Sequence, residues 1–113
     1  AAAVKELMAQ TFTLDQLMER GADVYARSCL ACHGANGEGG VGKAIAGSAI
    51  ATGDVAKHLD VGINGVPGTA MQAFGSQLND VDMAAVITYQ RNAFGNNMGD
   101  MVQPIDVYNR KKG

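Results

Sequence analysis

Two cysteines and a histidine stand within five positions of this chain, in the run "CLACH" at positions 29–33. Cys29 and Cys32 are the only cysteines, and His33 is one of two histidines. Thiols three positions apart lie about one helical turn from each other. Thiols and imidazoles bind metals, exchange disulfides and form covalent bonds to carbon. The sequence therefore predicts that the chemistry of this chain is concentrated in this short run.

Four kinds of site fit these residue types. A redox dithiol of the thioredoxin type requires a βαβ unit, and the sequence shows no alternating strand pattern. A zinc site would combine Cys29, Cys32 and His33 with His58, but the adjacent Cys32 and His33 would both have to point at one ion. A disulfide across two intervening residues closes too short a loop to stabilise the fold much.

Covalent haem attachment through Cys-x-x-Cys-His is the reading that explains every position, and we favour it. The two thiols add to the two vinyl groups of the porphyrin, which stand on neighbouring pyrroles. The next residue then projects over the ring, so Nε2 of His33 is expected to bind the iron. The predicted cofactor is one covalently bound haem c.

The second axial position of such an iron needs a ligand from elsewhere in the chain. Met71 is favoured, because it lies in an extended Gly/Pro-rich loop between two helices, where a thioether is free of helical constraint. Met83 falls in a helical apolar stripe and is expected to be ordinary core or surface. His58 is expected to be solvated on a surface helix. The remaining candidates are Met8, Met18, Met98 and Met101.

Three helices are predicted to position these residues, over about 14–28, 54–63 and 80–94. Their apolar residues recur at helical spacing. Thr13, paired with Gln16 in a capping box, is expected to cap the first helix and Asn79 the third, and Asp54 is expected in the first turn of the second.

The segments between and beyond the helices are predicted to be irregular. Residues 34–53 are rich in Gly, Ala and Ser, with a turn of helix expected near Lys43–Ala46. Residues 64–77, "NGVPGTAMQAFGSQ", read as loop by their Gly and Pro. The two ends, 1–12 and 96–113, are expected to dock weakly or not at all. The predicted fold class is all-α.

Composition supports a bound apolar cofactor and argues against two classes of partner. The 113 residues include no Trp, three Phe and three Tyr but fifteen Gly, so a large cofactor would supply missing core volume. The net charge is -2 and the one basic run is Arg110–Lys112, which disfavours nucleic acid. No apolar stretch is long enough to cross a membrane. The opening residues do not read as a signal peptide, so an exported chain is expected to have lost one or to belong to a longer parent.

Three stretches, "CLACHGANGEG", "GTAMQAFG" and "LNDVDMAAVITYQRNAFGNN", resemble a class I cytochrome c. Over about residues 13–104 the chain is most similar to the cytochrome c domain at the end of subunit II in caa(3)-type haem–copper oxidases of bacteria. The resemblance implies a class I cytochrome c fold, with three main helices and short turns around one haem c. Residues 1–12 are then a linker or N-terminal extension, and 105–113 a C-terminal tail.

The resemblance also implies roles for individual residues. Cys29 and Cys32 carry the haem, His33 is the proximal iron ligand, Met71 is the distal ligand and Ile45 contacts the haem. Gly21 and Tyr25 of the first helix are expected to pack against Tyr89 of the last.

The sequence departs from the family pattern at two positions. Gln72 follows the ligand methionine where many relatives have Pro. Lys43 stands where relatives have a Pro whose carbonyl accepts the N–H of the proximal histidine; any residue offers a carbonyl, so this bond can survive.

Electron transfer is the function that such a site implies, because both axial positions of the iron are filled. The resemblance suggests that the domain accepts an electron from a donor cytochrome c or a quinol-oxidising complex and passes it to the copper centre of a terminal oxidase. It would act on the periplasmic side of the cytoplasmic membrane, in a membrane-anchored parent, and would contain no substrate site of its own. Two alternatives remain: a free-standing periplasmic electron carrier, and a haem-based sensor or enzyme in which Met71 dissociates.

Overall fold

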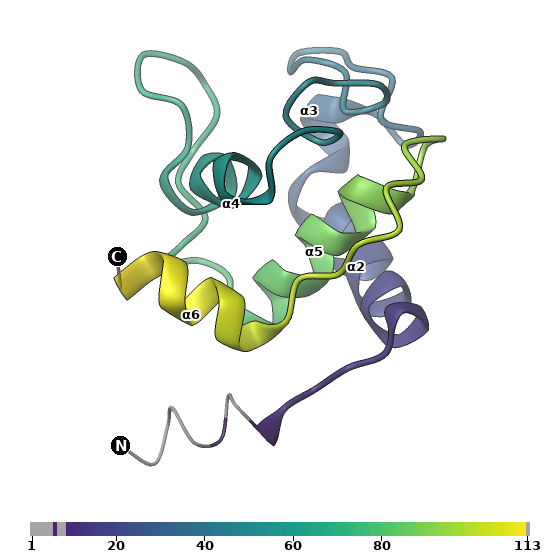
Figure 1. Cartoon of the computed structure of the whole chain (residues 1–113). Helices are drawn as coiled ribbons and strands as arrows, with labels where there is room; N and C mark the ends of the chain where they lie inside the picture. The colour runs from purple at the N-terminus through teal and green to yellow at the C-terminus, as the bar shows by residue number, and fades with distance from the viewer. Residues whose placement is uncertain (1–5, 7–8, 113) are drawn as a thin grey trace.

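Five helices form the regular structure of the computed structural model, which describes residue 6 and residues 9–112 (Figure 1). No strand occurs among these residues, so the prediction of an all-α chain is confirmed. The predicted helices are present with small shifts at their ends, and two short ones join them. The helices are α2 (Leu14–Ser28), α3 (Leu30–His33), α4 (Val55–Asn64), α5 (Asp80–Asn92) and α6 (Pro104–Lys112).

The crossing of α2 and α5 is the central contact of the fold. A Cβ placed on Gly21 would lie 2.6 Å from Cβ of Tyr89 and closer still to the carbonyl oxygen of Ala85. Glycine therefore lets the two backbones approach more closely than any other residue would allow. Tyr25 stacks beside Tyr89 with ring centroids 5.6 Å apart, and Phe94 contacts both rings. The expected packing of Gly21 and Tyr25 against Tyr89 is confirmed.

Polar residues begin the three main helices: Thr13 and Asn79 are caps as predicted, and Asp54, expected in the first turn, caps α4. At α2, the Thr13 side chain accepts from the backbone N–H of Gln16, and the Gln16 side chain accepts from that of Thr13. Asp54 accepts from the N–H of Lys57 at the start of α4, and Asn79 accepts from that of Asp82 at the start of α5. These caps satisfy amide groups that the first helical turn leaves without partners.

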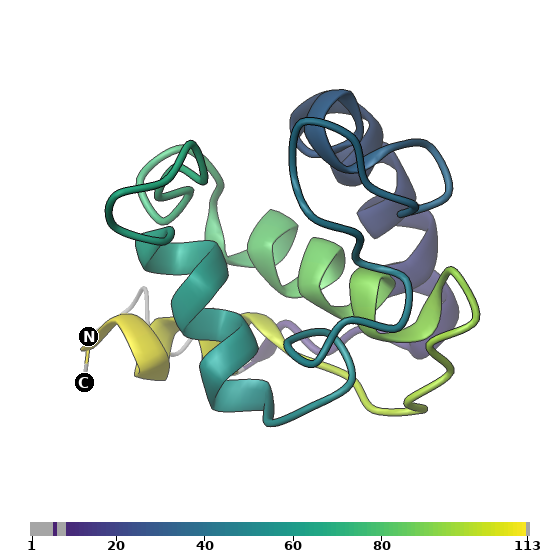
Figure 2. The same cartoon turned by 90° about the horizontal axis from the view of Figure 1, so that it is seen from above.

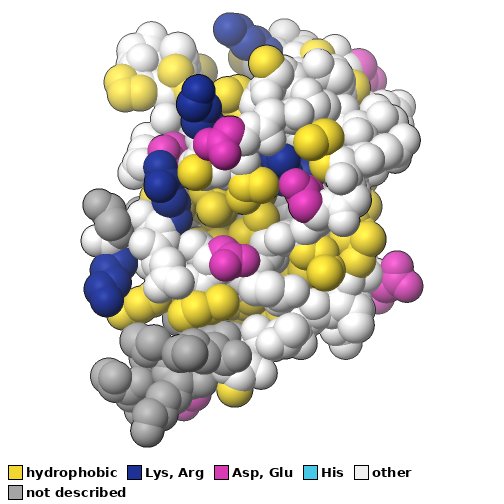
Figure 3. Space-filling view, viewed as in Figure 1, with side chains coloured by type: hydrophobic (Ala, Val, Ile, Leu, Met, Phe, Trp, Pro, Cys, Tyr) yellow, Lys and Arg dark blue, Asp and Glu magenta, His cyan; other side chains and the backbone are white. Residues whose placement is uncertain are grey.

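The C-terminal segment is not weakly docked, and the expectation for residues 96–113 was wrong. Val102 and Val107 are fully buried, and α6 packs on α5 and α4. Val102 N–H donates to the hydroxyl of Thr88 at 2.9 Å, which ties the segment before α6 to α5. Basic and acidic side chains lie next to one another over this part of the surface (Figure 3), where Arg110 pairs with Asp60 on α4.

Two long loops flank α5 and carry two of the predicted haem residues, Ile45 and Met71. Viewed from above, the segment after α3 stands on the same side of α5 as α2, and the segment after α4 stands on the opposite side (Figure 2). The expected turn of helix near Lys43–Ala46 is absent; turns occur at 46–47 and 49–52 instead. The run of small residues gives that loop few side chains to bury along a helical face, which explains its irregular path.

Candidate haem site

Both cysteines and His33 lie at the junction where α2 ends and α3 begins. Cys29 is the C-cap of α2, and its N–H donates to the carbonyl of Tyr25 at 2.9 Å. The same residue directly precedes α3. His33 is the last residue of α3, and its N–H donates to the carbonyl of Cys29 at 3.0 Å. Cys29 is half-buried against the core, whereas Cys32 is exposed, and both are free thiols.

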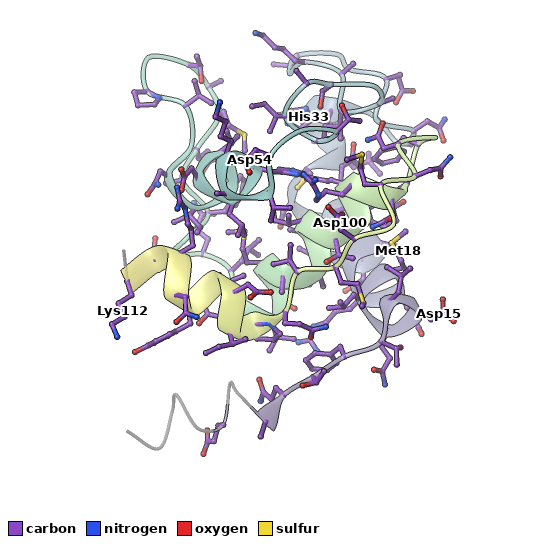
Figure 4. The ribbon with its side chains drawn as sticks, in the orientation of Figure 1. Asp15, Met18, His33, Asp54, Asp100 and Lys112 are labelled. Carbon is purple, nitrogen blue, oxygen red and sulfur yellow. The ribbon has the colours of Figure 1, made fainter. Side chains whose placement is uncertain are left out.

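The imidazole of His33 is held by a backbone carbonyl. Nδ1 of His33 lies 2.6 Å from the carbonyl oxygen of Lys43. A carbonyl oxygen only accepts, so Nδ1 carries the proton and donates it. Nε2 is therefore the ring nitrogen with a lone pair, which is the state that a histidine needs to bind a metal through Nε2. Figure 4 shows His33 at the end of α3, on the side of the molecule where the two long loops stand.

Gly42 leaves room for this ring. The N–H of Gly42 donates to the carbonyl of Cys32 at 2.8 Å, which folds the loop back over α3. A Cβ on Gly42 would lie 2.9 Å from Cε1 of His33, so a larger residue would push the ring aside. Ile45 follows two residues after Lys43 and is buried in the core.

Met71 lies in the loop that joins α4 to α5, half-buried. Its N–H donates to the Thr69 hydroxyl at 3.2 Å, and its carbonyl accepts from the N–H of Val66 at 3.2 Å. The N–H groups of Phe74 and Gly75 donate to carbonyls at the end of α4. The loop is thus fastened to α4 on the C-terminal side of Met71 by backbone bonds.

The side chain after Met71 offers a further tie within this loop. Gln72, which stands where many relatives have Pro, accepts from the amide of Gln77 at 3.0 Å. The bond joins two exposed side chains of the same loop, five positions apart.

His58 is buried, so the expectation of a solvated surface histidine was wrong. Its Nε2 lies 2.8 Å from Oε1 of Gln90, and its Nδ1 lies 3.4 Å from a guanidinium nitrogen of Arg91. Both ring nitrogens are engaged, which makes His58 a poor rival of Met71 as an iron ligand. Burial lowers the pKa of His58, the Gln90 bond opposes this, and Arg91 adds to it.

None of the other described methionines lies in the loop between α4 and α5. Met83 is fully buried in α5 and belongs to the core, as expected. Met98 and Met101 are exposed in the segment before α6. Met18 is half-buried on α2. Met8 lies outside the described residues.

Burial shapes the protonation of the groups beside the haem motif. Burial, together with the nearby Cys32, raises the pKa of the Cys29 thiol to about 11, although a bond from Gln90 lowers it. Burial likewise raises the pKa of Tyr25 to about 12, and its hydroxyl donates to the carbonyl of Gly34 at 2.7 Å.

The described residues also argue against zinc. Nowhere in residues 9–112 do three or more His, Cys, Asp or Glu side chains gather in a way that could hold a metal ion. The donor set is instead two thiols, one imidazole with a free Nε2, and a thioether on a separate loop. This set fits a porphyrin that brings four iron ligands of its own.

An all-α fold with an interlocked α2–α5 pair and a Cys-x-x-Cys-His turn is that of a cytochrome c domain. Residues 16–89, more than half of the chain, match the family described as "Cytochrome C oxidase, cbb3-type, subunit III", and the chain belongs to that family. Membership of a cytochrome c family implies a covalently bound haem c and an electron-transfer role. The finer resemblance to oxidase subunit II is not among these matches.

Two curated proteins are similar to the chain. Cytochrome c55X of Paracoccus denitrificans is 36% identical over 63 residues, which cover 56% of this chain and 61% of that protein. The Dihydro-heme d1 dehydrogenase of Pseudomonas aeruginosa is 33% identical over 69 residues, covering 61% of this chain and 14% of that protein. The chain thus spans less than two thirds of the length of either relative.

The structure adds site residues that the sequence analysis did not name. Gly42 makes room for the His33 ring, and Gln90, Arg91 and Asp100 build a polar chain behind Cys29. A buried arginine on a helix has no sequence signature, because Arg is rarely buried and its partners here lie in other elements.

Within the described residues, no helix has the length and apolar character needed to cross a membrane.

Proposed function

We propose that this domain carries single electrons through a haem c bound to Cys29 and Cys32, with His33 and Met71 as axial ligands of the iron. The haem supplies reversible one-electron exchange when bound. The observation that carries the proposal is the 2.6 Å bond between Nδ1 of His33 and the carbonyl of Lys43, which leaves Nε2 available. Two free cysteines adjoin this fixed imidazole, as covalent haem attachment requires.

The chain's own residues then orient the site and exclude water from it. The Lys43 carbonyl holds the tautomer and the plane of the His33 ring. The loop around Met71 presents a soft thioether, and His/Met ligation favours a raised reduction potential. Ile45 is proposed to contact the haem from the core side, where it is 8% exposed.

We place the domain in the path to a terminal haem–copper oxidase, on the periplasmic side of the bacterial membrane. The donor would be a cytochrome c or a quinol-oxidising complex, and the acceptor the copper centre of the oxidase. Support comes from the resemblance of "ITYQRNAFGN" to the domain fused to subunit II, and from the oxidase subunit in the family's description. Both cysteines of the chain are used for haem, so the copper would be held by another part of the parent or by a partner.

A second candidate is an electron-transfer domain attached to a dehydrogenase. The match to the Dihydro-heme d1 dehydrogenase covers only 14% of that protein, which shows a domain of this kind built into a larger chain. The reading frame around this chain distinguishes the candidates. A cupredoxin-like domain behind two hydrophobic helices supports the oxidase, and a large catalytic domain supports the dehydrogenase.

The test of the haem assignment is the spectrum of the protein made in cells with haem-attachment machinery. We expect two thioether bonds, a six-coordinate iron in both redox states, and no shift of the ferrous spectrum on adding carbon monoxide. Carbon monoxide binding to the wild-type protein would instead support a haem-based sensor or enzyme. Protein that gains no covalent haem would refute the proposal.

A further inference from the structure

A continuous polar chain crosses the interior between the surface and the sulfur of Cys29. It begins at Asp100, on the segment that joins α5 to α6 (Figure 4). The Asp100 carboxylate accepts from Nε of Arg91 at 3.0 Å and from a terminal nitrogen of the same guanidinium at 2.9 Å. Arg91 is 1% exposed, and it also donates to the carbonyl of Gly53 at 2.6 Å. Its charge is therefore buried, and each of its three nitrogens has a hydrogen-bond partner.

The next member of the chain is His58, whose tautomer follows from its neighbours. A guanidinium only donates, so Nδ1 of His58 must accept from Arg91 across their 3.4 Å separation. The ring is then neutral with its proton on Nε2, and Nε2 donates to Gln90 across 2.8 Å. A second proton on this ring would face the Arg91 charge directly.

The tautomer of His58 in turn fixes the amide of Gln90. The oxygen of Gln90 accepts from His58, so the amide nitrogen must point the other way. That nitrogen lies 3.8 Å from Sγ of Cys29 and donates toward it. In this polar chain, the orientation of each side chain follows from that of its neighbour. The series starts at the Arg91 guanidinium, which cannot accept a hydrogen bond.

We propose that Gln90 is a positioning residue for the haem-attachment sulfur of Cys29, and that His58 and Arg91 set its orientation so that an N–H donor faces that sulfur. The proposal rests on the proposed function, because it assigns Cys29 to the haem. The donor restrains the Cys29 side chain and draws electron density from its sulfur. Withdrawing electron density from a substituent of the ring would favour the reduced iron, so we expect this bond to raise the reduction potential. Exposed Cys32 lies outside this polar chain, so the two attachment points should differ.

The experiment compares holoprotein variants by reduction potential and by proton NMR of the groups that join each cysteine to the ring. Gln90→Leu removes the donor and should shift the potential negatively, with the Cys29-side resonances moving more than the Cys32-side ones. Gln103→Leu is the matched control: its amide is also half-buried, but bonds the backbone of Phe12 instead. We expect the control to leave both sets of resonances and the potential in place.

The role of His58 is tested with a second pair. His58→Leu leaves Gln90 free to turn, and should reproduce part of the Gln90→Leu shift. His58→Gln can accept from Arg91 and donate to Gln90, and should restore the wild-type values. A merely structural role would make both variants less stable without separating the Cys29 side from the Cys32 side.

Three results would overturn the proposal. The first is an equal effect of Gln90→Leu and Gln103→Leu on the reduction potential and the resonances. The second is a failure of His58→Gln to restore the values that His58→Leu changes. The third is measured on the wild-type protein and serves also if Gln90→Leu does not fold. We expect a nuclear Overhauser effect between the Gln90 amide protons and the proton beside the Cys29 sulfur, and its absence would refute the contact. Wild-type protein without covalent haem would instead refute the proposed function, so the two failures are distinct.

Discussion

Nδ1 of His33 and the carbonyl oxygen of Lys43 are 2.6 Å apart, although nine residues of glycine-rich loop separate them. The bond uses the backbone of residue 43 and none of its side chain. This explains how Lys can stand where relatives carry Pro without loss of the acceptor. The loop is held in place by other backbone bonds, including the one from Gly42 to Cys32 at 2.8 Å.

Changes at positions 42 and 43 should therefore have opposite outcomes. Lys43→Ala should leave the reduction potential and the ferric spectrum close to wild type, because the carbonyl remains. Gly42→Ala should disturb both, since its Cβ would lie 2.9 Å from Cε1 and 3.1 Å from Nδ1 of His33. Gly40→Ala serves as the control, because its Cβ would meet only the Cys32 carbonyl, at 3.3 Å. Equal spectra for Gly42→Ala and Gly40→Ala would contradict the role given to Gly42.

Met71→Ala should remove the distal iron ligand. We expect loss of the weak far-red band of Met-ligated ferric haem, a lower potential and binding of carbon monoxide to the ferrous protein. Met98→Ala is the control, because Met98 is exposed in the segment between α5 and α6. Persistence of the far-red band in Met71→Ala would assign the ligand to another methionine.

Gly21→Ala should destabilise the fold by about 1–3 kcal/mol, in spite of alanine's better helix propensity. Its Cβ would meet the backbone of Ala85, which cannot move without separating α2 from α5. Gly62→Ala is the matched helical control. Its Cβ would meet the ends of the Ile87 and Met83 side chains at 3.1 Å, which can shift. Thermal unfolding of the two holoproteins measures the difference, and an equal loss in both would refute the close-packing argument.

His58 should make stability depend on pH. Burial, the main cause, lowers its pKa in the folded protein below the ordinary value of about 6.5. The unfolded chain then binds a proton that the folded protein does not, so stability is full above about pH 6.5 and falls as pH drops toward the folded pKa. The slope is at most about 1.4 kcal/mol per pH unit. Denaturant unfolding between pH 5 and 8 should show a flatter curve for His58→Gln, and parallel curves would contradict the buried neutral ring.

The main helices were predictable because the signals that begin them are local. Thr13 and Gln16 form both bonds of a capping box, so α2 begins at Leu14 as the sequence indicates. Asn79 caps α5 as predicted and Asp54 caps α4, each through a single side-chain bond to a backbone N–H. The haem motif is equally local, since its residues occupy one turn and its chemistry depends on their spacing.

The features that sequence analysis missed depend on residues far apart in the chain. His58 looks like a surface histidine beside Lys57 and Asp60, and only its contacts with Gln90 and Arg91 make its burial favourable. The helix α6 has a short apolar pattern with three basic residues at its end. Its position depends on the burial of Val107 against α5 and α4, and its basic residues pair with Asp60 and Asp80, 50 and 31 residues away in the sequence. The ligation by Met71 and the haem contact of Ile45 stay predictions.

The rate of association with the redox partner should change little with salt concentration. The segments 39–53 and 61–79 stand on either side of α5 (Figure 2), and Lys43 is the one charged residue in them. Val41 is 86% exposed and Val66 39% exposed, so both offer uncharged contact surface. Many of the basic side chains elsewhere are paired with aspartates: Arg20, Arg27, Arg91, Arg110 and Lys111.

The association rate is measured by stopped-flow oxidation of the reduced domain by the copper domain of an oxidase subunit II, at several ionic strengths. Charge chiefly sets the association rate, and salt screens it over a Debye length of ~10 Å at 0.1 M. A domain that docks through the two loops should show a nearly constant rate, and Val66→Lys or a charge at Gln72 should slow it. Lys57→Gln is the control, because Lys57 is exposed on α4 outside both loops. A rate that falls steeply with salt, or that drops in Lys57→Gln but not in Val66→Lys, would show that a basic surface steers the partner instead.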